Sequence, residues 1–309
     1  MSTGQRLPIK IHLPAEFLDG EIRNGYRVEP KLKKIWAVEL DLFNELSRVC
    51  RKHDIKFQVF AGTLLGAIRH DGFIPWDDDF DVCMDRVNYR RLCKVAAHEF
   101  SSPYFFQTAF TDRRYFLPYA RLRNSNTTAA VTGVSGIDYN SGIYIDIHVL
   151  DGSPRSSLLL SLQEAAVRLM GWVVLDRLGV VDVVVRKKTA KIVRAVFSFF
   201  RYETLIAIYD FICRVSGCFC KQVAILGSGI DFLRRYRMNR ADLRKTVVHR
   251  YELYEVPVPE DYHSVLSGIY GDYMKFPPPE ERGKWHEGKI HFEPDIPYKE
   301  YFARMGKGK

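Results

Sequence analysis

The chain has 309 residues, of which 47% are hydrophobic and 27% are charged, and this balance excludes a disordered protein. Six cysteines in a chain of this size also exclude a small disulfide-stapled scaffold. The net charge of +9 is uneven, because residues 186–250 hold fifteen Lys or Arg against four acidic residues. This basic segment predicts an anionic partner such as a lipid surface or a phosphorylated glycan. We expect no nucleic acid, because no nucleic-acid-binding motif accompanies the segment.

The predicted elements in chain order indicate an α/β (α+β) core with a mixed sheet and flanking helices. Residues 1–30 show no regular pattern and are expected to form an irregular arm. Amphipathic periodicity predicts helices, and alternation of apolar residues predicts strands. The predicted elements of the core, residues 31–152, are a helix at 31–54, a strand at 55–62, a helix at 63–70, a strand at 79–84, a helix at 87–100, and strands at 117–123 and 142–150.

Residues 153–240 differ in character, since they are predicted to be helical, apolar and basic. Within them, residues 186–202 place Ile192, Val196 and Phe199 on one face of a helix and basic residues on the other. That pattern is typical of a helix lying in a membrane surface, and equally of an amphipathic helix that covers a domain. Residues 241–309 are predicted to carry a helix between two proline-rich turns and to complete the site.

Acidic residues crowd into one stretch beside large apolar side chains, at Asp71, Asp77, Asp78, Asp79 and Asp81. On a strand, Asp79 and Asp81 would point to one face while Phe80 and Val82 point to the other. Two carboxylates this close repel each other, and a divalent cation between them removes that cost. Because oxygen ligands suit hard cations, the pattern predicts a Mg²⁺ or Mn²⁺ site at the edge of the core.

A third carboxylate is available on the predicted strand at 142–150, where Asp146 and His148 share a face. If this strand neighbours the first, Asp146 can complete the metal shell or act as a base toward an attacking hydroxyl. A single histidine such as His148 is more often structural than catalytic.

Groups that can bind phosphate flank the aspartates. Gly62, at a strand-to-helix turn, would let backbone N–H groups face an anion, and Thr63 could donate a hydroxyl hydrogen bond. Arg69, Arg121 and Arg123 would supply the fixed positive charge that a diphosphate requires. Arg121 and Arg123 fit surface ion pairs equally well.

The stretch "AGTLLGAIRHDGFIPWDDDFDVCM" resembles the signature of the LicD family, which includes bacterial phosphocholine transferases and the animal fukutin and fukutin-related proteins. The similarity continues through "YFFQTAFTDRRYFLPYARLRNSNTT", "GIYIDIHVLDGSP" and "VPVPEDYHSVLSGIYGDYMKFPPPEER". The resemblance implies a nucleotidyltransferase-like fold, in which Gly62, Thr63, Asp79, Asp81 and Asp146 occupy the family's site positions. Asp77 matches a further acidic position and joins the expected metal ligands. The chain departs from the family at His148 and Val149, where Phe-Pro is common.

The resemblance also implies an activity. It is a Mg²⁺- or Mn²⁺-dependent phosphotransferase that moves phosphocholine from a CDP-choline-type donor to a sugar hydroxyl and releases CMP. The acceptor would be a cell-surface glycan, such as lipopolysaccharide or teichoic acid, or its lipid-linked precursor. A ribitol- or glycerol-phosphate transferase of the same fold and a true nucleotidyltransferase stay open as alternatives. Because the amino terminus shows no apolar signal region, we expect a cytoplasmic protein, peripheral on the inner face of the membrane.

Overall fold

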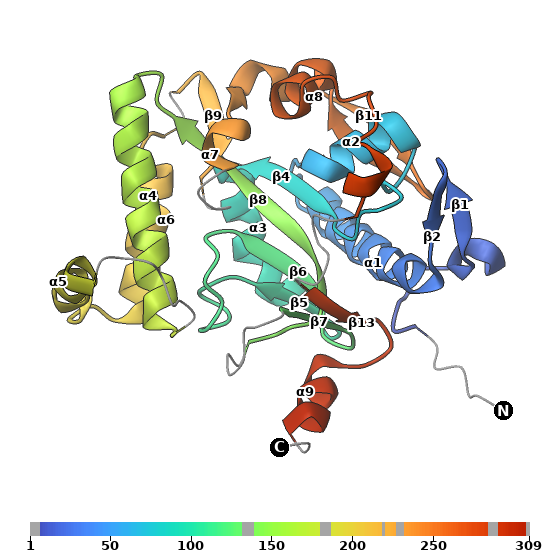
Figure 1. The fold of residues 1–309 in the computed structure, drawn as a ribbon, viewed down its shortest axis with the longest axis horizontal. Coiled ribbons are helices and arrows are strands. Elements are labelled where there is room, and N and C mark those ends of the chain that lie inside the picture. Colours follow the sequence, from blue (N-terminus) through green and yellow to red (C-terminus); the bar gives the residue numbers. More distant parts are fainter. Residues whose placement is uncertain are drawn as a thin grey trace.

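A seven-stranded mixed sheet forms the centre of the molecule (Figure 1). The computed structural model describes residues 7–131, 139–179, 187–217, 220–226, 232–283 and 290–306. The strands of this sheet are β3 (Gln58–Val59), β4 (Asp81–Asp85), β5 (Tyr104–Gln107), β6 (Ala120–Asn124), β8 (Ile143–Ser153), β9 (Gln222–Ile225) and β10 (Met238–Asn239). The mixture of helices around a mixed sheet confirms the predicted fold class.

The long strand β8 organises the sheet because it pairs with three other strands. It runs parallel to β4 and antiparallel to β6 and β9. Its first half is buried between apolar neighbours, with Ile143, Ile145 and Ile147 at 0% exposure. In the parallel pairing Asp81 lies opposite Asp146, so the neighbouring strands that the sequence analysis required are present.

Helices α1 (Pro30–Lys52), α2 (Ala61–His70) and α3 (Arg86–Glu99) pack on this sheet. Helix α1 lies across β6 and β8 and buries Trp36, Leu40 and Leu46 completely. Helix α2 begins two residues after β3 ends, and α3 follows β4 directly. The Asp85 side chain caps α3 by accepting a hydrogen bond from the Asn88 N–H at 2.8 Å, which explains why the strand turns into a helix there.

Helices α4 (Ser157–Arg177), α5 (Lys187–Phe197) and α6 (Tyr202–Arg214) stand at one end of the molecule (Figure 1). They share a second hydrophobic core, in which Val174 of α4 packs with Leu205 and Tyr209 of α6. Residue 186 of the predicted helix at 186–202 lies outside the described residues. The segment 153–240 is not helical throughout, because β9 and β10 return to the central sheet and α7 (Phe232–Arg235) lies between them.

The two ends of the chain complete the fold. The region predicted to be irregular contains a 3₁₀ helix (Ala15–Leu18) and a hairpin of β1 (Glu21–Arg23) and β2 (Tyr26–Val28). The carboxy-terminal region contains two further 3₁₀ helices (Arg240–Leu243 and Pro279–Glu281), the hairpin of β11 (Thr246–Tyr251) and β12 (Tyr254–Pro259), α8 (Tyr262–Tyr270), β13 (Ile290–Glu293) and α9 (Tyr298–Gly306). Strand β13 pairs with β7 (Thr128–Val131), so the carboxy-terminal region is tied back to the core.

Candidate active site

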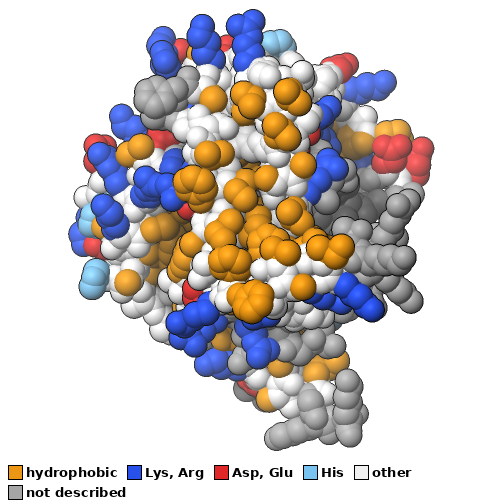
Figure 2. Space-filling model, turned by 90° about the vertical axis from the view of Figure 1, so that its left-hand side faces the viewer, with side chains coloured by type: hydrophobic (Ala, Val, Ile, Leu, Met, Phe, Trp, Pro, Cys, Tyr) orange, Lys and Arg blue, Asp and Glu red, His pale blue; other side chains and the backbone are white. Residues whose placement is uncertain are grey.

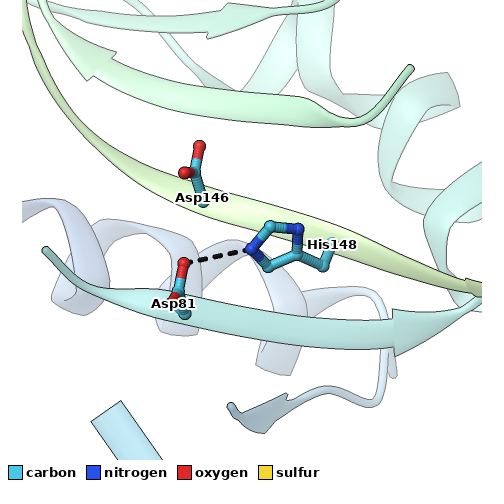
Figure 3. A group of neighbouring side chains, drawn as sticks. All are labelled: Asp81, Asp146 and His148. Atoms are coloured by element: carbon cyan, nitrogen blue, oxygen red, sulfur yellow. Dashed lines mark hydrogen bonds and ion pairs between the residues drawn. The ribbon is translucent and has the colours of Figure 1, made fainter. Parts of the chain in front are cut away.

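Three side chains from two neighbouring strands meet at the candidate site (Figure 3). Asp81 comes from β4, and Asp146 and His148 come from the same face of β8, as the alternation of the sequence predicts. One ligand atom from each of the three lies within 4.8 Å of the others. The His148 Nε2–H donates to Asp81 Oδ1 at 3.1 Å. The strand pairing thus brings Asp81 and Asp146 together from positions far apart in the sequence.

The start of β4 is fixed by hydrogen bonds from three elements. The Thr63 hydroxyl, on α2, accepts from the Asp81 N–H at 2.8 Å, and the side chain of Thr63 is buried. The Phe60 N–H donates to the Asp81 carbonyl, and the Asp146 N–H donates to the Phe80 carbonyl, both at 3.0 Å. Thr63 therefore positions Asp81, a contact that the phosphate-binding prediction did not include.

Asp77 and Asp79 lie in the loop before β4, because the strand begins at Asp81, two residues later than the pattern predicts. The loop passes close to Gly62, where an added Cβ would lie 2.8 Å from Asp77 Oδ2 and 3.8 Å from Asp79 Oδ1. The Trp36 Nε1–H, from α1, donates to the Asp77 carbonyl at 2.9 Å. Glycine at position 62 thus lets the carboxylates approach the first turn of α2.

Negative charge is concentrated at this point. Burial raises the pKa of Asp79 well above its usual value, and the charges of Asp77 and Asp81 add to the effect. Burial likewise raises the pKa of Glu39 on α1, and the charges of Asp78, Asp77 and Asp81 add to the effect. Glu39 is 1% exposed, and its Oε2 has no hydrogen-bond partner among the described residues. Sequence reasoning missed Glu39, although it interrupts the apolar stripe of α1.

His148 carries the opposite tendency. Burial would lower the pKa of His148, but the hydrogen bond to Asp81 and the charge of Asp81 outweigh it, so the pKa lies above the usual value. Its ring also lies 4.7 Å from the Tyr119 ring, between centroids. His148 therefore supports Asp81 and encloses the cluster on the side of Tyr119.

Two of the three predicted arginines lie on β6, where Arg123 is buried and Arg121 is partly exposed. Arg121 Nε donates to Asp146 Oδ1 at 2.6 Å, and its guanidinium lies 3.7 Å from the centre of the Tyr144 ring. Arg123 is 1% exposed and donates to the Gln107 side chain and to the Gly142 carbonyl. Arg121 thus joins the cluster through Asp146, whereas the contacts of Arg123 lie with neighbouring strands.

Arg69 reaches a different wall of the site. Its Nη1 donates to the Tyr273 carbonyl at 2.7 Å and to the Lys275 carbonyl at 3.3 Å, and its Nε donates to His70 Nε2 at 2.9 Å. Burial lowers the pKa of Arg69 below its usual value. Arg69 therefore holds the segment after α8 against α2, at one side of a pocket.

The pocket has a volume of about 360 Å³ and is lined by Asp77, Asp79 and Asp81 on one side. Residues that sequence reasoning did not single out line the rest of it. They include two cationic residues and four aromatic ones, namely Arg235, Lys275, Trp76, Tyr236, Tyr270 and Tyr273. Acidic, basic and aromatic groups around one cavity suit a ligand that carries phosphate and a cationic or aromatic part.

The donor set fits a divalent cation. Carboxylate oxygens favour Mg²⁺ or Mn²⁺, and the imidazole of His148 adds a donor that transition metals accept more readily than Mg²⁺. The raised pKa of Asp79 also indicates a cation site, because a bound cation would relieve the repulsion between the clustered carboxylates. Asp81 and Asp146 can therefore hold a metal ion, with Asp77 and Asp79 next to them, and His148 can join them as a ligand once Nε2 has lost the proton that it donates to Asp81.

Comparison with known proteins identifies the same part of the chain that forms the candidate site. The family model described as LicD/FKTN/FKRP, nucleotidyltransferase domain, matches residues 54–147, which include Gly62, the aspartate run and Asp146. The chain is 26% identical over 265 residues to the lipopolysaccharide cholinephosphotransferase LicD of Haemophilus influenzae, covering 82% of this chain and 96% of that protein.

Two uncharacterized relatives match shorter parts. A protein of Rickettsia prowazekii is 46% identical over 115 residues, which is 37% of this chain and 39% of that protein. A protein of Rickettsia typhi is 37% identical over 78 residues, 24% of each chain. The domain match, the aspartate geometry and the similarity along most of the chain agree, and we conclude that residues 54–147 carry a nucleotidyltransferase domain of the LicD/FKTN/FKRP type.

Proposed function

We propose that the protein transfers phosphocholine, or a similar phospho-alcohol, from a CDP-alcohol donor to a sugar hydroxyl and releases CMP. The acceptor in this proposal is a cell-surface glycan or its lipid-linked precursor. The observation that carries it is the pairing of β4 with β8, which sets Asp81 beside Asp146 at the edge of a pocket that Asp77 and Asp79 also line. The similarity to a lipopolysaccharide cholinephosphotransferase supports both the alcohol and the class of acceptor.

In this proposal the pocket binds the donor through charge. Arg235 and Lys275 line the same cavity as the aspartates and can pair with phosphate oxygens. Gly62 lies in the first turn of α2 and lines the cavity, and backbone N–H groups at a helix start attract an anion. A divalent cation held by Asp81 and Asp146, with Asp77 and Asp79 beside it, would neutralise the diphosphate and the charge that develops on the departing CMP.

The reaction is an in-line displacement at the β-phosphorus. A sugar hydroxyl oxygen forms the new bond to phosphorus, the bond to the CMP oxygen breaks, CMP leaves, and the hydroxyl proton passes to solvent water. Arg121 Nε donates to Asp146 Oδ1 at 2.6 Å, and Asp146 lies opposite Asp81 in the parallel strand pairing. A carboxylate that is held by a guanidinium beside a second carboxylate suits the role of metal ligand better than the role of base.

The aromatic lining supports choline over a polyol as the transferred alcohol. Tyr236, Tyr270 and Tyr273 line the same cavity as the aspartates. Aromatic faces attract a quaternary ammonium group, whereas ribitol and glycerol offer only hydroxyl groups. A donor with a trimethylammonium group would therefore gain contacts in this pocket that a polyol donor lacks.

The test is to supply purified protein and Mg²⁺ or Mn²⁺ with CDP-choline, CDP-ribitol or CDP-glycerol, and to measure CMP release and the mass of the acceptor. We expect CMP and an acceptor heavier by one phosphocholine. Asp81→Asn should lower turnover by more than about a hundredfold. Asp71→Asn makes the same chemical change at an exposed residue that ends α2, and it should leave turnover unchanged.

Two outcomes would overturn the proposal. A nucleotidylated acceptor without CMP would assign attack at the α-phosphorus and make the protein a nucleotidyltransferase. Full turnover of Asp81→Asn would separate the carboxylate cluster from the reaction.

A further inference from the structure

The surface of α4 that points away from the sheet is apolar along its length. Leu158, Leu162 and Leu169 follow one another at helical spacing and are 68%, 58% and 41% exposed. On the other side of the helix, Val167 and Val174 are buried against α6. A helix that is apolar all round is normally covered on every side, by protein or by lipid. The described residues cover only one side of α4.

Helix α5 and the turn that follows extend this surface. Ile192, Val196 and Phe199 are 66%, 56% and 90% exposed. Figure 2 shows hydrophobic side chains gathered over the middle of this end of the molecule, with Lys and Arg around them. We call the exposed sides of α4 and α5, with their surrounding cations, the apolar-basic face. Its apolar part is contiguous rather than scattered, which is uncommon on a surface exposed only to water.

The charges of the apolar-basic face are predominantly positive. The four acidic residues of α4, α5 and α6 are each held in a salt bridge, Glu164 with Arg234, Asp176 with Arg194, Glu203 with Arg201, and Asp210 with Arg86. The same region exposes further cations, at Arg155, Arg168, Arg177 and Lys191. An apolar centre with a cationic surround complements the headgroups and acyl chains of an anionic bilayer.

We propose that the apolar-basic face docks on a lipid bilayer that contains anionic lipid. A second copy of this chain would fit the face less well, because two cationic surrounds would oppose each other. Helix α4 has 21 residues and is long and apolar enough to cross a bilayer. Its buried side belongs to the second core, however, and crossing would remove Val167 and Val174 from α6. The helix therefore lies along the bilayer surface instead of spanning it.

This inference does not depend on the transfer reaction, and vesicle sedimentation tests it directly. We expect the wild-type protein to sediment with vesicles of phosphatidylcholine and phosphatidylglycerol, and to be released by high salt. Without phosphatidylglycerol, binding should weaken by about fivefold for each cation that contacts the surface. The variant Leu158→Asp/Leu162→Asp should lose at least about tenfold in binding, because it places two charges in the apolar centre.

A matched control separates docking from a general effect of added charge. Ile22→Asp/Val248→Asp also adds two carboxylates at exposed apolar residues, which are 79% and 63% exposed on β1 and β11. It should bind vesicles nearly as the wild type does, and circular dichroism should give all three proteins the same helix content. No sedimentation of the wild type with either vesicle would overturn the proposal. So would a dimer in solution that Leu158→Asp/Leu162→Asp dissociates while vesicle binding stays unchanged.

Discussion

Gly62→Ala is the smallest change that tests the geometry of the aspartate cluster. The new Cβ would stand 2.8 Å from Asp77 Oδ2, and ordinary van der Waals contact begins at 3.4 Å. The Asp77 carboxylate must therefore move by about 0.6 Å. Since a misplacement of about 1 Å at a reacting centre can cost about a hundredfold in rate, we expect turnover to fall by about tenfold or more.

The assay is CMP release as a function of Mn²⁺ concentration, measured beside thermal unfolding. For Gly62→Ala we expect weaker apparent metal affinity and a loss of stability of about 1–3 kcal/mol from the added methyl group. The control is Gly268→Ala, because Gly268 lies inside α8 and an added Cβ there meets nothing within 4 Å. That variant should keep its activity and gain about 0.5–1 kcal/mol, since alanine favours the helix.

The reasoning would be refuted if Gly62→Ala kept wild-type turnover and wild-type metal dependence. The close approach of the loop to α2 would then have no part in catalysis. Circular dichroism would show whether Gly62→Ala had lost activity only because it had unfolded. In that case Gly62→Ser would be compared with the wild type at a temperature at which both proteins are folded.

Three further predictions concern charge. Burial, and then the charge of Arg69, lower the pKa of His70 from 6.5 to about 4. Between these pH values the unfolded state binds a proton at His70 that the folded state does not bind, so stability falls as pH drops from 6.5 to 4. His70→Gln should remove that part of the pH dependence, about 1–2 kcal/mol after allowance for partial exposure, in urea titrations at pH 7, 5 and 4. Asp146→Asn should lower the free energy of unfolding by about 3–5 kcal/mol, because it leaves the Arg121 guanidinium without its carboxylate. Adding Arg121→Gln should restore most of the stability but none of the turnover. Equal stability of the single and the double variant would contradict this prediction. Asp79→Asn should raise the melting temperature in the absence of divalent ions, because it removes one of several negative charges that repel each other. It should also reduce the further rise in melting temperature that Mn²⁺ gives. A lower melting temperature without ions would contradict this prediction.

Local periodicity predicted the long elements well. The helix predicted at 31–54 is α1 at Pro30–Lys52, since its apolar stripe repeats over six turns and one side packs on the sheet. The strand predicted to begin at residue 79 begins at Asp81, because Asp79 stays in the loop beside Gly62. Alternation alone could not show this, since a loop residue two positions before a strand fits the same pattern.

The sequence predicted the site residues that lie close together along the chain, but not those that other elements of the fold bring to the pocket. Glu39 lies three residues after Trp36 and three before Leu42, so an acidic residue on the apolar stripe of α1 was the available signal. Arg235 had no such signal, because it reaches the pocket from more than a hundred residues beyond the aspartates. Lys275 lies in the carboxy-terminal segment that was expected to complete the site, but no pattern there singled it out. Arg123 shows the reverse case, in which a cation two residues from Arg121 binds Gln107 and Gly142 instead of the cluster.

The pocket has two walls that come from separate parts of the sequence, and the hydrogen bonds from Arg69 to the carbonyls of Tyr273 and Lys275 join them. One wall holds the carboxylates and comes from residues 61–81, and the other is built from residues 235–283. On the proposed function, changes in the second wall would exchange one donor alcohol for another without changing the carboxylates of the first wall. Chimaeras that join the first 230 residues of this chain to the tail of a relative would therefore be expected to inherit donor preference from the tail.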